Sequence, residues 1–299
     1  MKIKKKDLTY KLNEVNRTAA VVNCVAHKTP FSIEIPKAVK HEGNLYTVTS
    51  IGDQAFMRCK RLENIMIHDS VTSIGWSAFR GCKELKSITI PDGITFIERN
   101  MFDGCESLKS VSITGNVTKI GEWAFFECTS LESITIPKGV IEIGNHAFFK
   151  CTSLESVTIP DGVTEIGNWV FSNCDNLKSI VIPDSVTEIG WGAFADSKSL
   201  KKIMLPDSVK EIGIQAFRNC SSLESITIPE GVTFIGVGAF CGCNSLKSIT
   251  IPDGITGIDG SWFVGCNNLI EINVPVSDKS FPLWISLMDS EYAGLVNLV

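Results

Sequence analysis

CTSLESITIP, at Cys128–Pro137, returns as CTSLESVTIP at Cys151–Pro160, 23 residues further along the chain. The same spacing governs most of the sequence, because phenylalanine recurs at positions 56, 79, 102, 125, 148, 171, 194, 217, 240 and 263. Leucine follows each phenylalanine by six residues, and cysteine lies between the two in nine of the ten units. Ten units in constant register, from about Leu45 to Val274, predict a solenoid in which each unit forms one coil.

Each unit ends in a stretch where apolar and hydroxyl residues alternate, as in Leu131–Ile136. The alternation predicts a strand with one buried face, and the proline that usually follows ends it because proline cannot donate to a ladder. Val163–Ile166 predicts a second short strand, and the Ala-Phe-x-x-Cys segment predicts one helical turn with Phe and Cys facing inward. Stacked coils would pair their strands in parallel along a rod or shallow arc of about 50 Å. The expected fold is therefore mainly β, with one continuous core.

The unit IPxxVTxIGxxAFxxCxSLxSIT, as found at residues 136–158, resembles the repeat of the BspA-like leucine-rich-repeat family. The stretch Leu8–Val22 is also similar to the β-hairpin cap that precedes such arrays. Because the ends of a solenoid expose apolar residues and strand edges, we predict three regions: an N-terminal cap at 1–44, the repeat array at 45–275 and a degenerate final repeat or cap at 276–299. The resemblance implies a non-enzymatic binding protein, and members are often displayed on microbial surfaces where they bind host matrix proteins or other cells.

Composition and charge narrow the classes of partner and location. The net charge of −5 argues against a nucleic-acid binder, which needs a basic face. No apolar stretch approaches the length of a membrane span, so membrane insertion is not expected. The start of the chain, MKIKKKDLTYKLNE, has no apolar segment typical of a secretory signal. The location therefore stays open, since the resemblance favours the cell surface whereas eleven cysteines favour a reducing compartment.

Nine of the eleven cysteines occupy one inward column, and Ser197 takes the tenth place. A column that accepts serine is best explained as a stack of small buried thiols. Paired C-x-x-C arms are lacking, so no metal or other cofactor is expected, and Cys241, outside the column, is expected to be exposed. The four histidines have no nucleophile or acid at a catalytic spacing, so we expect no enzyme.

Columns that vary between coils are where a binding site can lie. One set is aromatic, at positions that the repeat does not require: Trp123, Phe126, His146, Phe149 and Trp169. Such a group indicates an exposed interaction patch, or rings that fold back to cover apolar surface. A second set is acidic and stacks in one column: Glu142, Glu165, Glu188 and Glu211. It would attract a basic partner or a cation, or it is simply a solvated face.

These patterns favour a monomeric scaffold that recognises a macromolecule without covalent chemistry. The partner is expected to be a protein, with extracellular-matrix proteins among the candidates and a glycan as the alternative. Aromatic anchors would supply binding energy, and acidic residues would steer the approach. The competing interpretation is a structural protein whose caps or faces pair with copies of the same chain.

Overall fold

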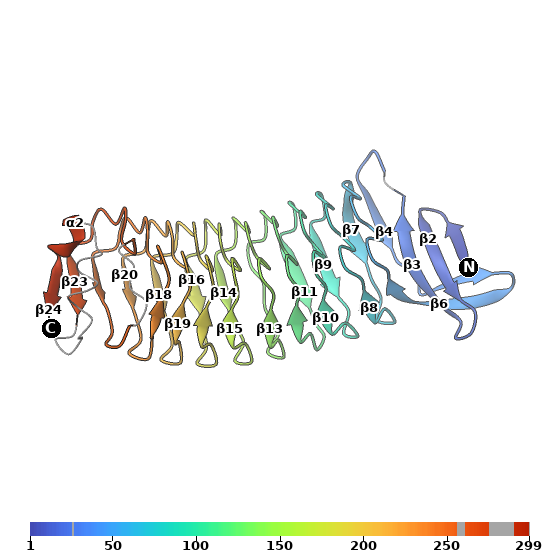
Figure 1. Ribbon diagram of the computed structural model, residues 1–299. Helices are drawn as coiled ribbons and strands as arrows, with labels where there is room; N and C mark the ends of the chain where they lie inside the picture. Colours follow the sequence, from blue (N-terminus) through green and yellow to red (C-terminus); the bar gives the residue numbers. More distant parts are fainter. Residues whose placement is uncertain (26, 256–260, 275–289, 299) are drawn as a thin grey trace.

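The computed structural model describes residues 1–25, 27–255, 261–274 and 290–298. In these ranges the chain forms an elongated solenoid of strands and turns, with its two termini at opposite ends (Figure 1). The only α-helix among the described residues is the short α2 (Ser290–Ala293). The prediction of a mainly β solenoid with parallel strands is confirmed.

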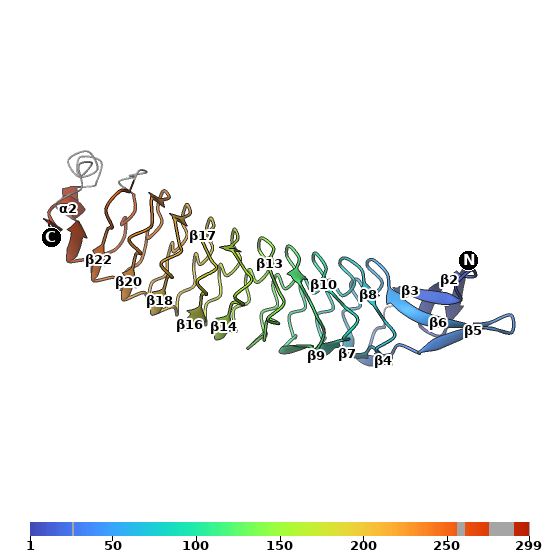
Figure 2. The same cartoon turned by 90° about the horizontal axis from the view of Figure 1, so that it is seen from below.

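Two parallel ladders run along the rod. The longer strands are β4 (Phe31–Glu34), β7 (Leu62–Met66), β9 (Ser87–Ile90), β11 (Ser110–Ile113), β14 (Ser156–Thr158), β16 (Ser179–Val181), β18 (Lys202–Met204), β20 (Ser225–Thr227), β22 (Ser248–Thr250) and β23 (Glu271–Val274). The shorter ones are β8 (Ser73–Ile74), β10 (Phe96–Ile97), β12 (Lys119–Ile120), β13 (Glu142–Ile143), β15 (Glu165–Ile166), β17 (Glu188–Ile189), β19 (Glu211–Ile212) and β21 (Phe234–Ile235). Figure 2 separates the two, with β9, β14, β16 and β18 along one edge of the rod and β10, β13 and β17 above them.

The strand predicted at Leu131–Ile136 is not formed, although it is the segment whose pattern is clearest. Its only pairing is an isolated bridge between Ser133 and Ser156. The side chains still alternate as predicted, because Ile134 and Ile136 are buried while Thr135 is exposed. The long-strand ladder is thus interrupted between β11 and β14, as it is between β16 and β18, while the core beneath it continues.

The third side of each coil, predicted as a helical turn, is a run of tight turns. Its N–H groups divide between two sets of acceptors: Phe126 donates to the Trp123 carbonyl in its own coil, whereas Phe125 donates to the Ala147 carbonyl of the next coil. Two residues of this coil are left-handed, Trp123 at φ 58° and Glu127 at φ 54°. Left-handed residues interrupt a right-handed helix, so the helical prediction is wrong. The Phe and Cys side chains nevertheless face inward as expected.

Stacked phenylalanines form the centre of the core. The rings of consecutive coils lie nearly parallel, with centroids between 5.2 Å (Phe125 to Phe148) and 6.1 Å (Phe240 to Phe263) apart. All ten of these side chains are fully buried. Burial of aromatic rings contributes strongly to stability, and offset stacking adds to it. The phenylalanines that recur every 23 residues therefore form one continuous stack, which we call the phenylalanine ladder.

Hydrogen bonds to the backbone explain the cysteine column. The Cys151 thiol donates to the Phe125 carbonyl (Sγ···O 3.2 Å), and the Ser197 hydroxyl donates to the Phe171 carbonyl at 2.7 Å. The predicted stack of buried, unpaired thiols is present, whereas Cys241 is half-buried rather than exposed. Within the inward column, burial raises the pKa of the thiols of Cys82, Cys105, Cys128, Cys151, Cys174, Cys220, Cys243 and Cys266, so these eight remain protonated donors at neutral pH.

Replacing Cys151 by alanine is expected to lower the free energy of unfolding by about 1–2 kcal/mol, because a buried hydrogen bond and some volume are lost. The loss stays moderate since the Phe125 carbonyl also accepts from the Cys128 N–H. Cys151→Ser should cost less, because Ser197 donates the same bond elsewhere in the column. Urea denaturation measures both changes, and equal losses would show that the thiol acts through volume alone.

Strands outside the repeat lie at both ends. At the N-terminus, β1 (Lys2–Lys5), β2 (Leu8–Asn13), β3 (Thr18–Cys24), β6 (Asn44–Ile51) and β5 (Ala38–His41) form a sheet in that order. The β5–β6 hairpin crosses the predicted boundary at 44/45, because β6 also pairs with β8 of the array. At the C-terminus, β24 (Val296–Leu298) extends the long ladder beyond β23. Most of the predicted tail, residues 276–289, lies outside the described residues, so the three-region division stays a prediction.

Candidate functional site

Three predicted ring residues stack across successive coils. The Trp123 and His146 rings have centroids 3.9 Å apart and planes 6° apart, and the Trp169 ring lies 6.5 Å beyond His146 at 15°. All three residues are left-handed, with φ between 57° and 59°. The 23-residue spacing predicts that coil stacking places these three side chains side by side, and the shared left-handed backbone, which was not predicted, keeps them in register.

The far side of Trp169 covers the next coil. An ideal Cβ at Gly192 would lie 2.5 Å from the Trp169 ring, so a side chain at that position would displace the indole. The faces of the stacked rings are therefore directed at neighbouring coils. All three side chains are half-buried. Their edges, rather than their faces, remain available to a partner.

Phe126 and Phe149 extend this group. Their rings stack with centroids 5.4 Å apart, and the Phe126 ring meets Trp123 edge-on at 5.0 Å. The Lys150 Nζ lies 5.8 Å from both phenylalanine centroids and 2.9 Å from the Glu127 carboxylate. The structure thus brings all five predicted residues into one half-buried unit, which we call the aromatic cluster: Trp123, Phe126, His146, Phe149 and Trp169.

His146 is the titratable member of the aromatic cluster. Burial lowers the pKa of its imidazole, and the nearby Glu122 carboxylate partly offsets this. Its Nδ1 is buried and has no hydrogen-bond partner among the described residues. The ring therefore contributes a neutral stacking surface at physiological pH.

The predicted acidic column lies on the short-strand ladder and is exposed. Glu165, Glu188 and Glu211 face one another in register on β15, β17 and β19. Partial burial raises the pKa of the Glu188 carboxyl, and Glu165 and Glu211 raise it further. Glu142 differs, because its carboxylate lies 2.6 Å from the Lys119 Nζ. We call these four residues the acidic ridge: Glu142, Glu165, Glu188 and Glu211.

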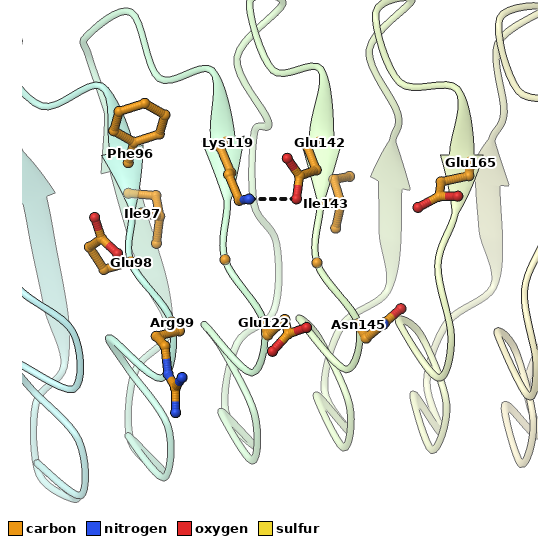
Figure 3. A pocket seen from close by; sticks show the side chains of 12 residues that line it. Phe96, Ile97, Glu98, Arg99, Lys119, Glu122, Glu142, Ile143, Asn145 and Glu165 are labelled. Atoms are coloured by element: carbon orange, nitrogen blue, oxygen red, sulfur yellow. Dashed lines mark ion pairs between the residues drawn. The ribbon is translucent and has the colours of Figure 1, made fainter.

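A groove of about 470 Å³ connects the two sets (Figure 3). Phe96, Lys119, Glu142 and Glu165 line one side, and Arg99, Glu122 and Asn145 line the other. Gly121 and Gly144 lie between the two rows and narrow the side-chain lining there to Ile97, Glu98 and Ile143. Each of Glu122 and Asn145 directly precedes a member of the aromatic cluster in the chain. The acidic ridge, the groove and the aromatic cluster therefore occupy adjacent strips of the same coils.

Sequence reasoning selected the two strips but missed the groove and its rim residues Phe96, Arg99 and Glu122. Aligning the units at period 23 gives the missing signal. Glycine recurs at positions 52, 75, 121, 144, 167, 190, 213 and 236, between two columns of larger residues. A column of glycines between two columns of larger side chains predicts a groove along the solenoid axis.

The unpaired carboxylates of the acidic ridge should make stability depend on pH. The folded-state pKa of Glu188 is raised, so its favourable contribution is present at acid pH and is lost as pH rises through that pKa. Glu188→Gln is expected to raise the free energy of unfolding at neutral pH by about 0.5 kcal/mol, after allowance for solvent screening. The increase in the free energy of unfolding should vanish at a pH where the Glu188 carboxyl is protonated in both the folded and the unfolded protein.

Glu142→Gln is the matched control, because it removes an ion pair with Lys119 instead of a repulsion. It should lower stability slightly at neutral pH. Urea denaturation of both variants at neutral pH and at about pH 3 makes the comparison. Equal effects of the two substitutions would contradict the assigned repulsion.

Neither metal-binding nor membrane-spanning features are found in the described part of the chain. No group of three or more His, Cys, Asp and Glu side chains there could hold a metal ion. Within the same ranges, no helix has the length and apolar character needed to cross a membrane.

Comparison with known proteins agrees with the repeat. The family profile described as BspA type Leucine rich repeat region, in 6 copies, matches residues 49–178 and 164–284. A search of curated proteins gave no match.

Solved structures of bacterial repeat proteins share the fold. A leucine rich cell surface protein from Faecalibacterium prausnitzii is 29% identical over 97% of this chain and 98% of that chain, with a TM-score of 0.51. A leucine-rich repeat protein from Bacteroides ovatus is 26% identical over 99% of both chains, with a TM-score of 0.54. The leucine rich repeat protein of T. pallidum is 29% identical over 67% of this chain and 91% of that chain, with a TM-score of 0.59.

Repeats and folds of this kind are typical of protein-interaction scaffolds without catalytic activity. The profile matches well over half of the residues, and the matched ranges contain all ten phenylalanines of the ladder. The chain belongs to the BspA-type leucine-rich-repeat family.

Proposed function

We propose that the protein binds a protein partner noncovalently through the groove, the aromatic cluster and the acidic ridge. The observation that carries the proposal is that the aromatic residues lie in columns where most other coils place small or polar ones. Asn100 occupies the column of Trp123 and Trp169, and Ser172 occupies the column of Phe126 and Phe149. The coil folds without these rings, so their concentration beside a groove is best explained by recognition.

The arrangement suits an extended segment that lies along the solenoid axis. Ring edges and the Lys150–Glu127 pair would contact one side of the segment, and the carboxylates of the acidic ridge would attract its basic side chains. Because the tryptophan faces pack on neighbouring coils, stacking on flat sugar rings fits less well than a protein contact.

The expected partners are extracellular-matrix proteins, and the expected role is adhesion at a cell surface. This expectation rests on the family and on the cell-surface relative from Faecalibacterium prausnitzii. The binding unit is expected to be a monomer. Sedimentation analysis tests this state, and concentration-dependent assembly would instead support a structural role.

The test is a binding screen against matrix proteins and a glycan array. The parent should bind a matrix protein, and the variant Trp123→Asn/Phe126→Ser/Phe149→Ser/Trp169→Asn should lose at least about tenfold in affinity. Each substitution introduces a residue that the same column already accepts elsewhere, so the coils should stay folded. Circular dichroism checks this.

Val181→Thr/Met204→Thr is the matched control on the long-strand face. Both side chains are exposed, and Thr158 and Thr227 fill the same column in neighbouring coils. This variant should bind like the parent. Equal binding by parent and aromatic-cluster variant, or loss in the control, would move the site away from the aromatic cluster.

A further inference from the structure

A second cavity lies outside the repeat, in the N-terminal sheet. It measures about 460 Å³ and lies between the β1–β2 hairpin and the segment that carries β4 and β5. Although β1 and β5 are at opposite edges of the sheet, residues next to both line this one cavity. Its volume falls within the range of small-molecule pockets.

The interior of this cavity is apolar. Leu8, Tyr10 and Val39 are buried, and Ile33 and Ala38 are half-buried beside them. Burial raises the pKa of the Tyr10 phenol to about 12, so this group is uncharged at neutral pH and does not repel an anion. The lining therefore favours the apolar body of a ligand.

The rim of the cavity carries an excess of positive charge. Lys5, Lys6 and Lys40 line it, are exposed, and form no ion pair among the described residues. Two carboxylates also line it, and that of Asp7 already lies 3.3 Å from the Nε2 of His27. The first 40 residues hold nine basic and three acidic side chains, in a chain of net charge −5. An anion is therefore attracted to this end of the molecule in particular.

We propose that this cavity binds a small amphiphilic carboxylate. The apolar body would lie against Leu8, Tyr10 and Val39, and the carboxylate would lie among the three rim lysines. A cation is disfavoured by the unpaired lysines, and a purely polar anion would leave the apolar lining without a partner. The site is separate from the groove and does not depend on the function proposed for the repeat.

Isothermal titration calorimetry of the full chain with decanoate tests the proposal. Decanoate, kept below the concentration at which it aggregates, should bind with one site per chain. Decanol, which has the same chain without the charge, should bind at least about tenfold more weakly, and decyltrimethylammonium should not bind. Failure of decanoate to bind, or equal binding of decanol, would overturn the proposal.

Two variants locate the site. Lys5→Gln/Lys6→Gln/Lys40→Gln should weaken decanoate binding about tenfold by removing three exposed charge contacts, and Ala38→Trp should abolish binding by filling the cavity. Lys2→Gln/Lys4→Gln/Lys28→Gln is the charge-matched control, because these exposed lysines do not line the cavity. If the control weakened decanoate binding as much as the rim-lysine variant, the effect would come from the general positive charge of this end of the molecule, and the assigned site would be wrong. Undiminished decanoate binding by Ala38→Trp would also overturn the assigned site.

Discussion

Replacing Phe148 by alanine is expected to lower the free energy of unfolding by about 3–5 kcal/mol, the usual loss for a buried phenylalanine. The side chain is fully buried and stacks between Phe125 and Phe171, with centroids 5.2 and 5.4 Å away. Its removal leaves a cavity in the middle of the ladder. Because each coil of a solenoid contacts only its neighbours, amide exchange should increase first in the coils on either side of residue 148.

The adjacent residue gives the control for this prediction. Phe149 is half-buried and belongs to the aromatic cluster instead of the core ladder. Phe149→Ala should lower the free energy of unfolding by about 1 kcal/mol, in proportion to the smaller apolar area that it covers. Urea denaturation of both variants makes the comparison. Similar losses from the two substitutions would show that the phenylalanine ladder is not the dominant element of the core.

The inward columns could be predicted from the sequence because a fixed period separates inside from outside directly. Phenylalanine and leucine recur in all ten units at the positions of Phe148 and Leu154, cysteine recurs in nine of ten at the position of Cys151, and these three residues are all buried. Hydrogen bonding was harder to predict. The replacement of one cysteine by Ser197 indicated a small buried group, but only the structure shows that both side chains donate to a phenylalanine carbonyl.

The conformation of the third side of each coil, the run of tight turns, could not be predicted from one unit alone. Trp123 and Trp169 are left-handed although tryptophan does not favour that conformation, and the Ala-Phe-x-x-Cys pattern is compatible with a helix. The aligned column does carry the signal, because Asn100 and Gly192 share it and both tolerate positive φ. Comparing units, rather than examining each one, would have replaced the helical turn by a left-handed turn.

The candidate site was predicted in parts. The aromatic cluster and the acidic ridge were identified because they depart from the repeat, whereas the groove depends on side chains from four coils around a column that is mostly glycine. Nothing within Leu131–Ile136 explains why its strand is missing, since the same pattern forms a strand in the neighbouring β14. The 23-residue period therefore predicts which side chains are buried better than it predicts which strands of neighbouring coils pair.

The glycine column beneath the groove is expected to set the distance between coils. An ideal Cβ at Gly144 would lie 2.5 Å from the Glu122 nitrogen and 2.8 Å from the Gly121 carbonyl carbon, so Gly144→Ala must push two backbones apart. The expected loss in free energy of unfolding is about 1–3 kcal/mol, as for other overpacked sites. Among the array residues that the structure describes, one side chain occupies this column, Glu98, which lines the groove, so the strain is expected to be tolerated without unfolding.

Gly139→Ala is the control, because its Cβ would meet only the Val117 carbonyl oxygen at an ordinary 3.5 Å. This substitution should change stability by less than about 0.5 kcal/mol. Chemical denaturation compares the two variants. A loss confined to Gly144→Ala would show that close backbone approach at this column fixes the coil spacing, and with it the groove between the acidic ridge and the aromatic cluster. Equal, small losses of stability from Gly144→Ala and Gly139→Ala would contradict this. They would show that the coils can separate at Gly144 at little cost, as they already accommodate the Glu98 side chain in the same column.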